Sequence, residues 1–231
     1  MNGDVARGME AALDDYEAND DLRCAILKAN GKAFCAGADL KLIAAGKGAE
    51  MSTKKGGFAG LIQRDRKKPL IAAVTGSALA GGTEVALSCD MIVAADNTNF
   101  GLPEVKRSLI AAAGGVFRLP RVIGKTAAME VILTGDPLPA PRAYELGMIN
   151  YVVPEDEVVA KAEELANRVA VNAPLAVQAS RGLAARALLG GEDIDHFKAG
   201  SQAFKAIAAS EDFKEGPKAF IEKRAPVWKG R

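Results

Sequence analysis

Residues 68–104 read KPLIAAVTGSALAGGTEVALSCDMIVAADNTNFGLPE. Two apolar runs in this stretch, at 70–74 and 91–95, have the length of buried strands and are bounded by proline, glycine or charged residues. A turn of small residues at 78–82 follows the first run and leads into a helix-like segment that carries Glu84. The stretch therefore predicts a strand, a tight turn, a helix and a second strand, and we expect the rest of the chain to pack around this unit.

Glu84 is the first candidate catalytic residue. It lies near the start of the predicted helix, and no other charged residue occurs between Lys68 and Asp90. Taken alone, a carboxylate at this point is interpreted most simply as a partner of the helix dipole on a solvated face. The lack of neighbouring charges favours a buried position instead, where desolvation raises the pKa of a carboxylate and suits it to acid/base catalysis. Spacing alone leaves both interpretations open.

Glu104 is the second candidate, in a Gly-Leu-Pro-Glu turn. A surface turn residue is the simpler interpretation, but a carboxylate there could also face Glu84 across a substrate. Gly81 and Gly82 would let the backbone approach a ligand, and the free N–H groups at a helix start can stabilise an oxyanion. The loop 36–39 is a second small-residue corner that leads into a helix. Together these features predict an acid/base site with an anion-stabilising corner.

The remaining chain alternates short strands with helices as far as residue 153, and only helices follow. The pattern predicts strands at 24–29 and 148–153, helices at 4–18, 39–45, 58–66, 116–122, 125–133 and 140–146, and a mobile surface segment at 46–57. Further helices are expected at 156–171, 174–189, 193–209 and 211–224. This order indicates an α/β core over residues 1–153 and a helical C-terminal region over residues 154–231.

The composition narrows the class of protein. The chain has 231 residues, 49% apolar and 26% charged, with a net charge of +1, so nucleic-acid binding is not indicated. No apolar run approaches the ~20 residues that cross a bilayer, and a secretory signal is lacking, which predicts a cytoplasmic protein without a membrane partner. Three widely spaced cysteines and one histidine, His196, argue against a disulfide framework or a metal site. The pairs Lys54–Lys55 and Lys67–Lys68 are expected to be solvated charges.

Four segments of the chain resemble the enoyl-CoA hydratase/isomerase family, also called the crotonase family. They are GKAFCAGADL (31–40), the opening stretch extended to residue 105, AMEVILTGDPLPAPRAYELGMINYVVP (128–154) and KAFIEKRAPVW (218–228). The resemblance implies a crotonase-like α/β fold, a spiral of ββα turns, followed by a helical trimerisation region in a homotrimer or a dimer of trimers. It also implies an acyl-CoA thioester as ligand, so that coenzyme A is part of the substrate and no separate cofactor is expected.

The resemblance also assigns roles to individual residues. By motif position, the backbone N–H groups of Ala38 and Gly81 would form the oxyanion hole, and Glu84 and Glu104 would be the two catalytic acids. Contacts with CoA are implied for Ala36, Asp39, Lys41, Phe220 and Lys223, the last two from a neighbouring subunit. Both acids are present, which favours an enoyl-CoA hydratase, a lyase that adds water syn to a trans-2-enoyl-CoA as in fatty-acid β-oxidation.

Two other functions are compatible with the resemblance to this family. A Δ3,Δ2-enoyl-CoA isomerase would shuttle a proton with Glu104 as the main base, whereas a non-catalytic homologue would bind acyl-CoA without turnover. Two departures from the family pattern bear on this choice. Ala112 stands where the best-known hydratases have a glycine in a Pro-Gly-Ala-Gly-Gly turn, and the N-terminal strand hairpin of family members is expected to be missing before the first helix.

Overall fold

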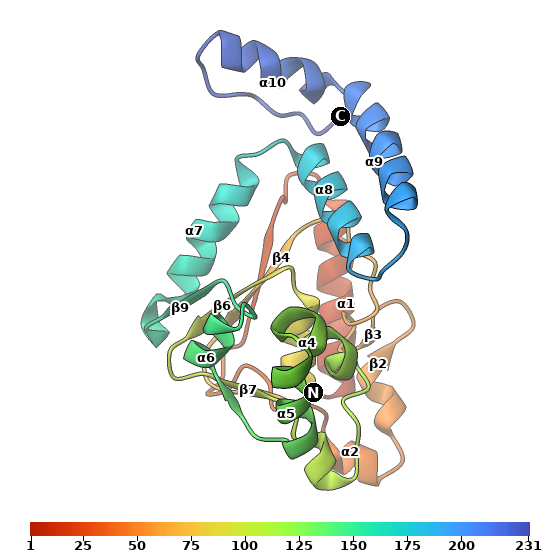
Figure 1. The fold of residues 1–231 in the computed structure, drawn as a ribbon, viewed down its shortest axis with the longest axis vertical. Coiled ribbons are helices and arrows are strands. Elements are labelled where there is room, and N and C mark those ends of the chain that lie inside the picture. Colours follow the sequence, from red (N-terminus) through yellow and green to blue (C-terminus); the bar gives the residue numbers. More distant parts are fainter.

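A four-stranded parallel sheet forms the centre of the computed structural model, which describes residues 1–231 (Figure 1). The strands lie in the order β1 (Ala25–Lys28), β4 (Leu70–Val74), β6 (Met91–Ala95) and β9 (Tyr151–Val153). All three neighbouring pairs are parallel, since the chain crosses over between strands instead of making hairpins. The two apolar runs of the opening stretch are the two central strands, and every residue of β4 is buried.

After each of the two central strands, β4 and β6, the chain continues into a strand of a second sheet. Its three strands are β5 (Ala78–Leu79), β7 (Asn99–Gly101) and β8 (Leu138–Pro139). Thus β4 is followed by β5 and a helix, and β6 is followed by β7 and, after one 3-10 turn, another helix. This repeat of two strands and a helix is the ββα turn that we expected. A separate antiparallel pair joins β2 (Ser52–Thr53) to β3 (Gly57–Phe58).

Helices surround the sheets and continue to the end of the chain. Those within the first part are α1 (Gly3–Ala18), α2 (Leu40–Ala44), α3 (Gly81–Ser88), α4 (Gly115–Ile123), α5 (Lys125–Thr134) and α6 (Ala140–Glu145). Three single 3-10 turns are η1 (Gly48–Met51), η2 (Pro103–Arg107) and η3 (Glu155–Glu157). The C-terminal helices are α7 (Val158–Ala170), α8 (Pro174–Ala187), α9 (Asp193–Ala208) and α10 (Glu211–Ile221). Side chains of Asn2, Asp39 and Ser210 cap α1, α2 and α10.

The two faces of the central sheet bury different clusters, because side chains alternate along each strand. On β4, Ile71 and Ala73 belong to one cluster, while its other three residues belong to the larger one. The smaller cluster is completed by Val158 and Ala162 of α7. Helix α7 is therefore packed directly on the sheet, although it lies within the region 154–231 that the sequence separates from the core.

Helices α9 and α10 lie at the end of the molecule opposite α2, whereas α8 is joined to the core through Arg181 (Figure 1). Large apolar side chains of α9 face solvent in the single chain, where Phe197 is 73% exposed and Phe204 is 62% exposed. None of the helices combines the length and the apolar character needed to cross a membrane.

Two local expectations were wrong. The segment 58–66 is not helical, because Ala59 and Gly60 have φ angles of 59° and 67°, outside the helical region. A Cβ atom on Gly60 would lie 2.2 Å from the carbonyl oxygen of Ala6, so this turn presses against α1. The segment 46–57 is not simply a loose surface loop, since it forms η1 and strand β2 and buries Met51, which is 3% exposed.

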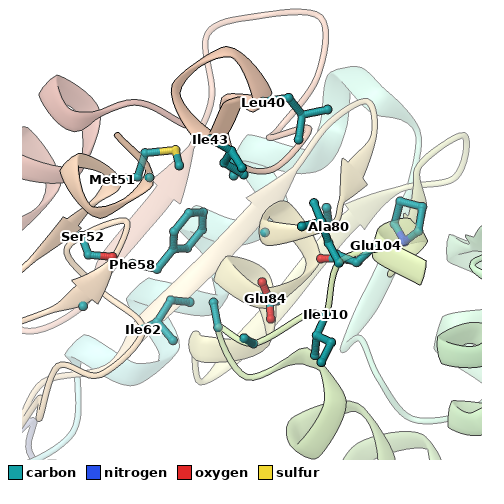
Figure 2. A pocket seen from close by; sticks show the side chains of 18 of the residues that line it. Leu40, Ile43, Met51, Ser52, Phe58, Ile62, Ala80, Glu84, Glu104 and Ile110 are labelled. Carbon is teal, nitrogen blue, oxygen red and sulfur yellow. The ribbon is translucent and has the colours of Figure 1, made fainter. Parts of the chain in front are cut away.

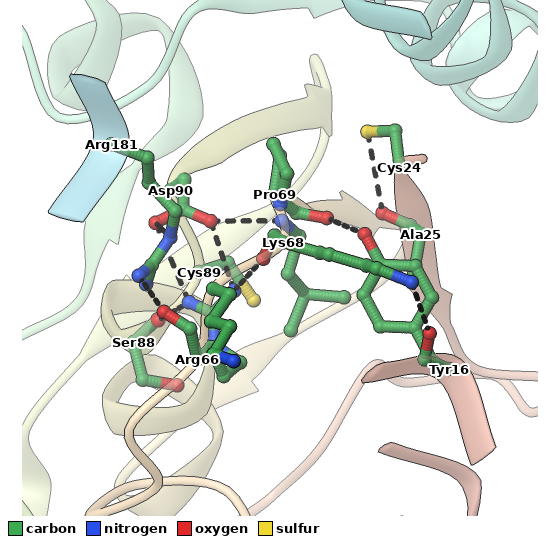
Figure 3. Close-up of polar contacts among 12 residues, drawn as sticks. Tyr16, Cys24, Ala25, Arg66, Lys68, Pro69, Ser88, Cys89, Asp90 and Arg181 are labelled. Atoms are coloured by element: carbon green, nitrogen blue, oxygen red, sulfur yellow. Dashed lines mark hydrogen bonds and ion pairs between the residues drawn. The ribbon is translucent and has the colours of Figure 1, made fainter. Parts of the chain in front are cut away.

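The expectation that Lys68 is solvated was also wrong. Its side chain is buried, and its Nζ donates hydrogen bonds to the carbonyl oxygens of Tyr16 at 2.9 Å and Asn19 at 2.7 Å (Figure 3). These carbonyls lie at the C-terminal end of α1, where unpaired C=O groups favour a cation. Lys68 thus fixes the end of α1 beside the start of β4.

An ion-pair network around the buried side chain of Arg66 ties α3, β4 and α8 together (Figure 3). The side chain of Arg66 is 2% exposed and donates to Asp90 Oδ2 at 2.9 Å and to the carbonyl oxygen of Ser88 at 2.8 Å. Asp90 also accepts from the N–H of Leu70 at 2.8 Å and from Arg181 Nε at 2.9 Å. One carboxylate therefore joins the end of α3, the first residue of β4 and the C-terminal helix α8.

We expect Asp90→Ala to lower the free energy of unfolding by about 3 kcal/mol, because it leaves the Arg66 guanidinium buried without its anion. Denaturant unfolding followed by circular dichroism measures this loss. Asp136→Ala is the matched control, since it removes an ion pair with Lys106 in which both side chains are exposed, and we expect it to leave stability nearly unchanged. Equal effects of the two substitutions would contradict the assignment of Asp90 as the central link.

Candidate active site

A pocket of about 970 Å³ lies between the start of α3, the turn η2 and the loop that precedes α4 (Figure 2). Helix α2, the β2–β3 pair and α4 also contribute to its wall. Fourteen of the 26 lining residues are hydrophobic. Glu84 and Glu104 both line it, and Figure 2 shows their side chains directed into the same space. A mostly apolar pocket with a few converging polar groups is the usual form of a small-molecule site.

Glu84 occupies the first turn of α3 and is 3% exposed. Its Oε1 accepts a hydrogen bond from the backbone N–H of Gly115 at 2.9 Å. The helix can begin here only because Gly82 lacks a side chain, since a Cβ atom would lie 2.0 Å from the carbonyl oxygen of Cys35. The buried position that the sequence favoured for Glu84 is therefore confirmed.

Burial raises the pKa of Glu84 to about 7. The negative charge of Glu104 adds to this rise, whereas the N–H of Gly115 and the positive charge of Arg118 oppose it. A carboxyl group with a pKa near neutrality can give or take a proton at physiological pH, which is the property that general acid/base catalysis needs.

Glu104 stands in the first turn of η2, directly after Pro103. Its Oε2 is buried and has no hydrogen-bond partner. Burial also raises the pKa of this carboxyl group above its ordinary value. A buried carboxylate oxygen without a partner costs stability, so its presence at a pocket wall points to a ligand or water that completes it.

The two small-residue corners meet at the pocket. A β-bridge joins Cys35 to Ala78, and the N–H of Leu79 donates to the carbonyl oxygen of Cys35 at 2.9 Å. A Cβ atom on Gly37 would lie 2.7 Å from the methyl group of Ala80 and 3.1 Å from the nitrogen of Gly81, so only glycine allows this approach. The two predicted oxyanion corners are thus adjacent.

Ala38 and Gly81 both line the pocket. The backbone N–H of Ala38 donates no hydrogen bond within the chain. Gly81 is the first residue of α3, so its N–H has no acceptor inside the helix. Two N–H groups at neighbouring corners of one pocket are suited to bind a developing oxyanion, and this role remains a prediction.

A model of the enoyl-CoA hydratase/isomerase family matches residues 1–231. The chain belongs to this family. It is 44% identical to the mevalonyl-coenzyme A hydratase of Beauveria bassiana over 230 residues, which cover 93% of this chain and 81% of that protein. It is 40% identical to the carnitinyl-CoA dehydratase of Salmonella typhi over 228 residues, which cover 96% of this chain and 87% of that protein.

Solved structures agree with the family. The crystal structure of an enoyl-CoA hydratase from Mycobacterium tuberculosis matches with a TM-score of 0.94 and 43% identity, covering 100% of this chain and 90% of that chain. The expected crotonase fold with a C-terminal helical region is therefore confirmed. The protein is a crotonase-family hydratase/isomerase that acts on CoA thioesters.

The residues expected to contact CoA are not all brought together in one chain. Ala36 lines the pocket, whereas Asp39 caps α2 by accepting a hydrogen bond from the N–H of Lys41 at 2.9 Å. The side chain of Lys41 is exposed on α2. Phe220 is 85% exposed on α10, and Lys223 follows that helix, at the end of the molecule opposite α2 (Figure 1). Their predicted contacts with CoA would have to come from another subunit.

Several polar pocket residues were missed by sequence reasoning. Ser52, Gln63 and Arg118 line the pocket, but each lies in a segment interpreted as mobile or helical without a role. The only signal for Arg118 was its place one helical turn after Gly114, which no general rule connects with a site. The backbone N–H of Ala112 donates to the carbonyl oxygen of Ile110 at 2.7 Å, so it is not free to face the pocket.

We expect Glu84→Gln to raise stability in alkaline solution. The folded state raises the pKa of Glu84 from 4.5 to about 7, so ionisation above pH 7 destabilises the native protein. A neutral glutamine keeps the acceptor for Gly115 and should gain about 2–3 kcal/mol in unfolding free energy at pH 8.5, falling to almost nothing near pH 4.5. Denaturant unfolding of the parent and the variant at several pH values measures this stability difference. A difference that does not change with pH would contradict the raised pKa of Glu84.

Proposed function

We propose that the protein is an enoyl-CoA hydratase that adds water syn to a trans-2-enoyl-CoA and forms a 3-hydroxyacyl-CoA. The observation that carries this proposal is the pair of carboxyl groups that face one pocket, the buried Glu84 and the half-buried Glu104 with its buried Oε2. Hydration needs one group to take a proton from water and another to supply a proton to carbon. The unpartnered Oε2 of Glu104 would accept a hydrogen bond from the reacting water.

The thioester carbonyl would lie between the N–H groups of Ala38 and Gly81. As the water oxygen bonds to C3, the C2–C3 double bond moves its electron pair toward the carbonyl, and negative charge develops on the thioester oxygen. The two N–H donors stabilise this enolate-like charge, which is absent from the ground state. One glutamate takes the water proton and the other delivers a proton to C2, so the elements of one water molecule are added.

A neighbouring subunit would complete the CoA site in this proposal. Phe220 and Lys223 would reach the CoA of an adjacent chain, while Ala36, Asp39 and Lys41 would contact it from the same chain. The exposed phenylalanines of α9, Phe197 and Phe204, support such an association, because exposed apolar patches of this kind usually mark an interface. The expected assembly is a homotrimer or a dimer of trimers.

A substrate with a polar acyl group is the second candidate. Two relatives are named for mevalonyl-CoA and carnitinyl-CoA, and the polar residues Ser52, Gln63 and Arg107 line this pocket. Figure 2 shows Ser52 on the wall near Met51, away from Glu84. Steady-state assays with crotonyl-CoA, longer 2-enoyl-CoA esters and the dehydration products of these two polar esters would distinguish them, and a 3-enoyl-CoA would detect isomerase activity.

We expect Glu84→Gln and Glu104→Gln each to lower kcat for 2-enoyl-CoA hydration about 100-fold or more, because each removes one proton-transfer group. Loss of the conjugated enoyl thioester, followed by its ultraviolet absorbance, measures the rate. Glu163→Gln is the matched control, since Glu163 lies exposed on α7 and should leave kcat unchanged. Rates like the parent's in both site variants would overturn the proposed mechanism.

A further inference from the structure

Arg118 is a partly buried cation at the pocket that the hydration mechanism does not use. It lies on α4, lines the pocket, and forms no ion pair with a carboxylate. Instead its guanidinium donates from Nη2 to the carbonyl oxygen of Ile62 at 2.7 Å and from Nη1 to that of Ala113 at 3.3 Å. Two backbone carbonyls from segments far apart in the sequence are therefore joined by one side chain.

The segment between Ala113 and Arg118 contains Gly115, whose backbone N–H contacts Glu84. The N–H of Arg118 donates to the carbonyl oxygen of Gly114 at 2.8 Å, and the N–H of Gly115 donates to Glu84 Oε1 at 2.9 Å. A Cβ atom on Gly114, whose φ is +114°, would lie 2.4 Å from Arg118 Nη1. The guanidinium is thus packed directly over the turn that presents the Gly115 amide to Glu84.

We propose that Arg118 is a positioning residue for Glu84. Its guanidinium holds the 113–115 turn against Ile62, so that the Gly115 amide stays on the carboxylate, and it brings a positive charge to the pocket that Glu84 also lines. The inference rests on the proposed role of Glu84 in hydration, but the physical link between Arg118 and Glu84 can be measured without turnover.

The charges around Glu84 support this link. Glu104 of η2 is the negative group that faces it, and Arg118 of α4 is the positive group. Arg118 is in turn near Arg121 on its own helix, near Arg66 and near Cys89 at the end of α3. Removing the Arg118 charge leaves Glu84 facing Glu104 alone, and the pKa of Glu84 should rise further.

The experiment compares Arg118→Gln, which removes the charge, with Arg118→Lys, which keeps the charge but cannot reach both carbonyls. We expect Arg118→Gln to lower kcat about 10- to 100-fold with KM changed less than about threefold, because the reacting group is misplaced while substrate contacts remain. The limb of the kcat–pH profile governed by Glu84 should move upward. Arg118→Lys should also lose rate, but with a smaller upward movement of this limb, because the positive charge is kept.

A second readout separates this inference from the proposed reaction. The pH midpoint of the stability difference between Glu84 and Glu84→Gln reports the titration of Glu84 directly, and it should move upward in the Arg118→Gln background. Arg121→Gln, an exposed arginine one turn away from the backbone contacts, is the matched control and should move neither readout. If hydration fails but this midpoint moves, only the proposed function is wrong.

Three results would overturn the inference. One is an unchanged Glu84 midpoint in Arg118→Gln together with the kcat of the parent. Another is a loss confined to KM, which would make Arg118 a substrate contact. The third is a movement of the pH limb in Arg118→Lys as large as that in Arg118→Gln, which would mean that the positive charge at position 118 does not act on Glu84. If Arg118→Gln does not fold, Arg118→Lys still tests the loss of kcat at a nearly unchanged KM, and a parent-like kcat in that variant would overturn the inference.

Discussion

The active-site pocket depends on a close backbone approach between the loop around Gly37 and the start of α3. The carbonyl of Cys35 lies where a side chain at residue 82 would have to be, and Gly37 lies against Ala80 and Gly81. No residue with a Cβ atom allows this packing, and the β-bridge from Cys35 to Ala78 fixes its register. Because α3 starts at this contact, the same constraint places Ala38 and Gly81 together at the pocket wall and sets the position of Glu84.

The protein then places two carboxyl groups where their ionised forms are costly. Burial raises the pKa of both Glu84 and Glu104, and the negative charge of Glu104 raises the pKa of Glu84 further. The opposing contributions are the Gly115 amide and the Arg118 guanidinium, both supplied by the chain that follows η2. We interpret this balance as one that keeps the pKa of Glu84 at about 7. Burying the carboxylate lowers the stability of the folded protein, but it provides a group that can transfer protons at neutral pH.

Sequence reasoning succeeded where one physical signal dominated. The runs 70–74 and 91–95 are apolar throughout, and the structure makes them the two central strands. It failed where tertiary contacts overrode local propensity. The turn at Ala59 is left-handed because it packs on α1, and Lys68 is buried because α1 ends in carbonyls that need a donor. Nor could spacing reveal Arg118, since its partners are backbone carbonyls, which carry no signature in the sequence.

The central claim is that the paired glutamates add water across an enoyl thioester. The most direct measurement is mass spectrometry of the product after turnover of a trans-2-enoyl-CoA in D₂O and, separately, in ¹⁸O-labelled water. Hydration by this site predicts one solvent oxygen at C3 and one solvent hydrogen at C2 in the same product. Deuterium incorporated with a shifted double bond and no solvent oxygen, as in an isomerase, would contradict it.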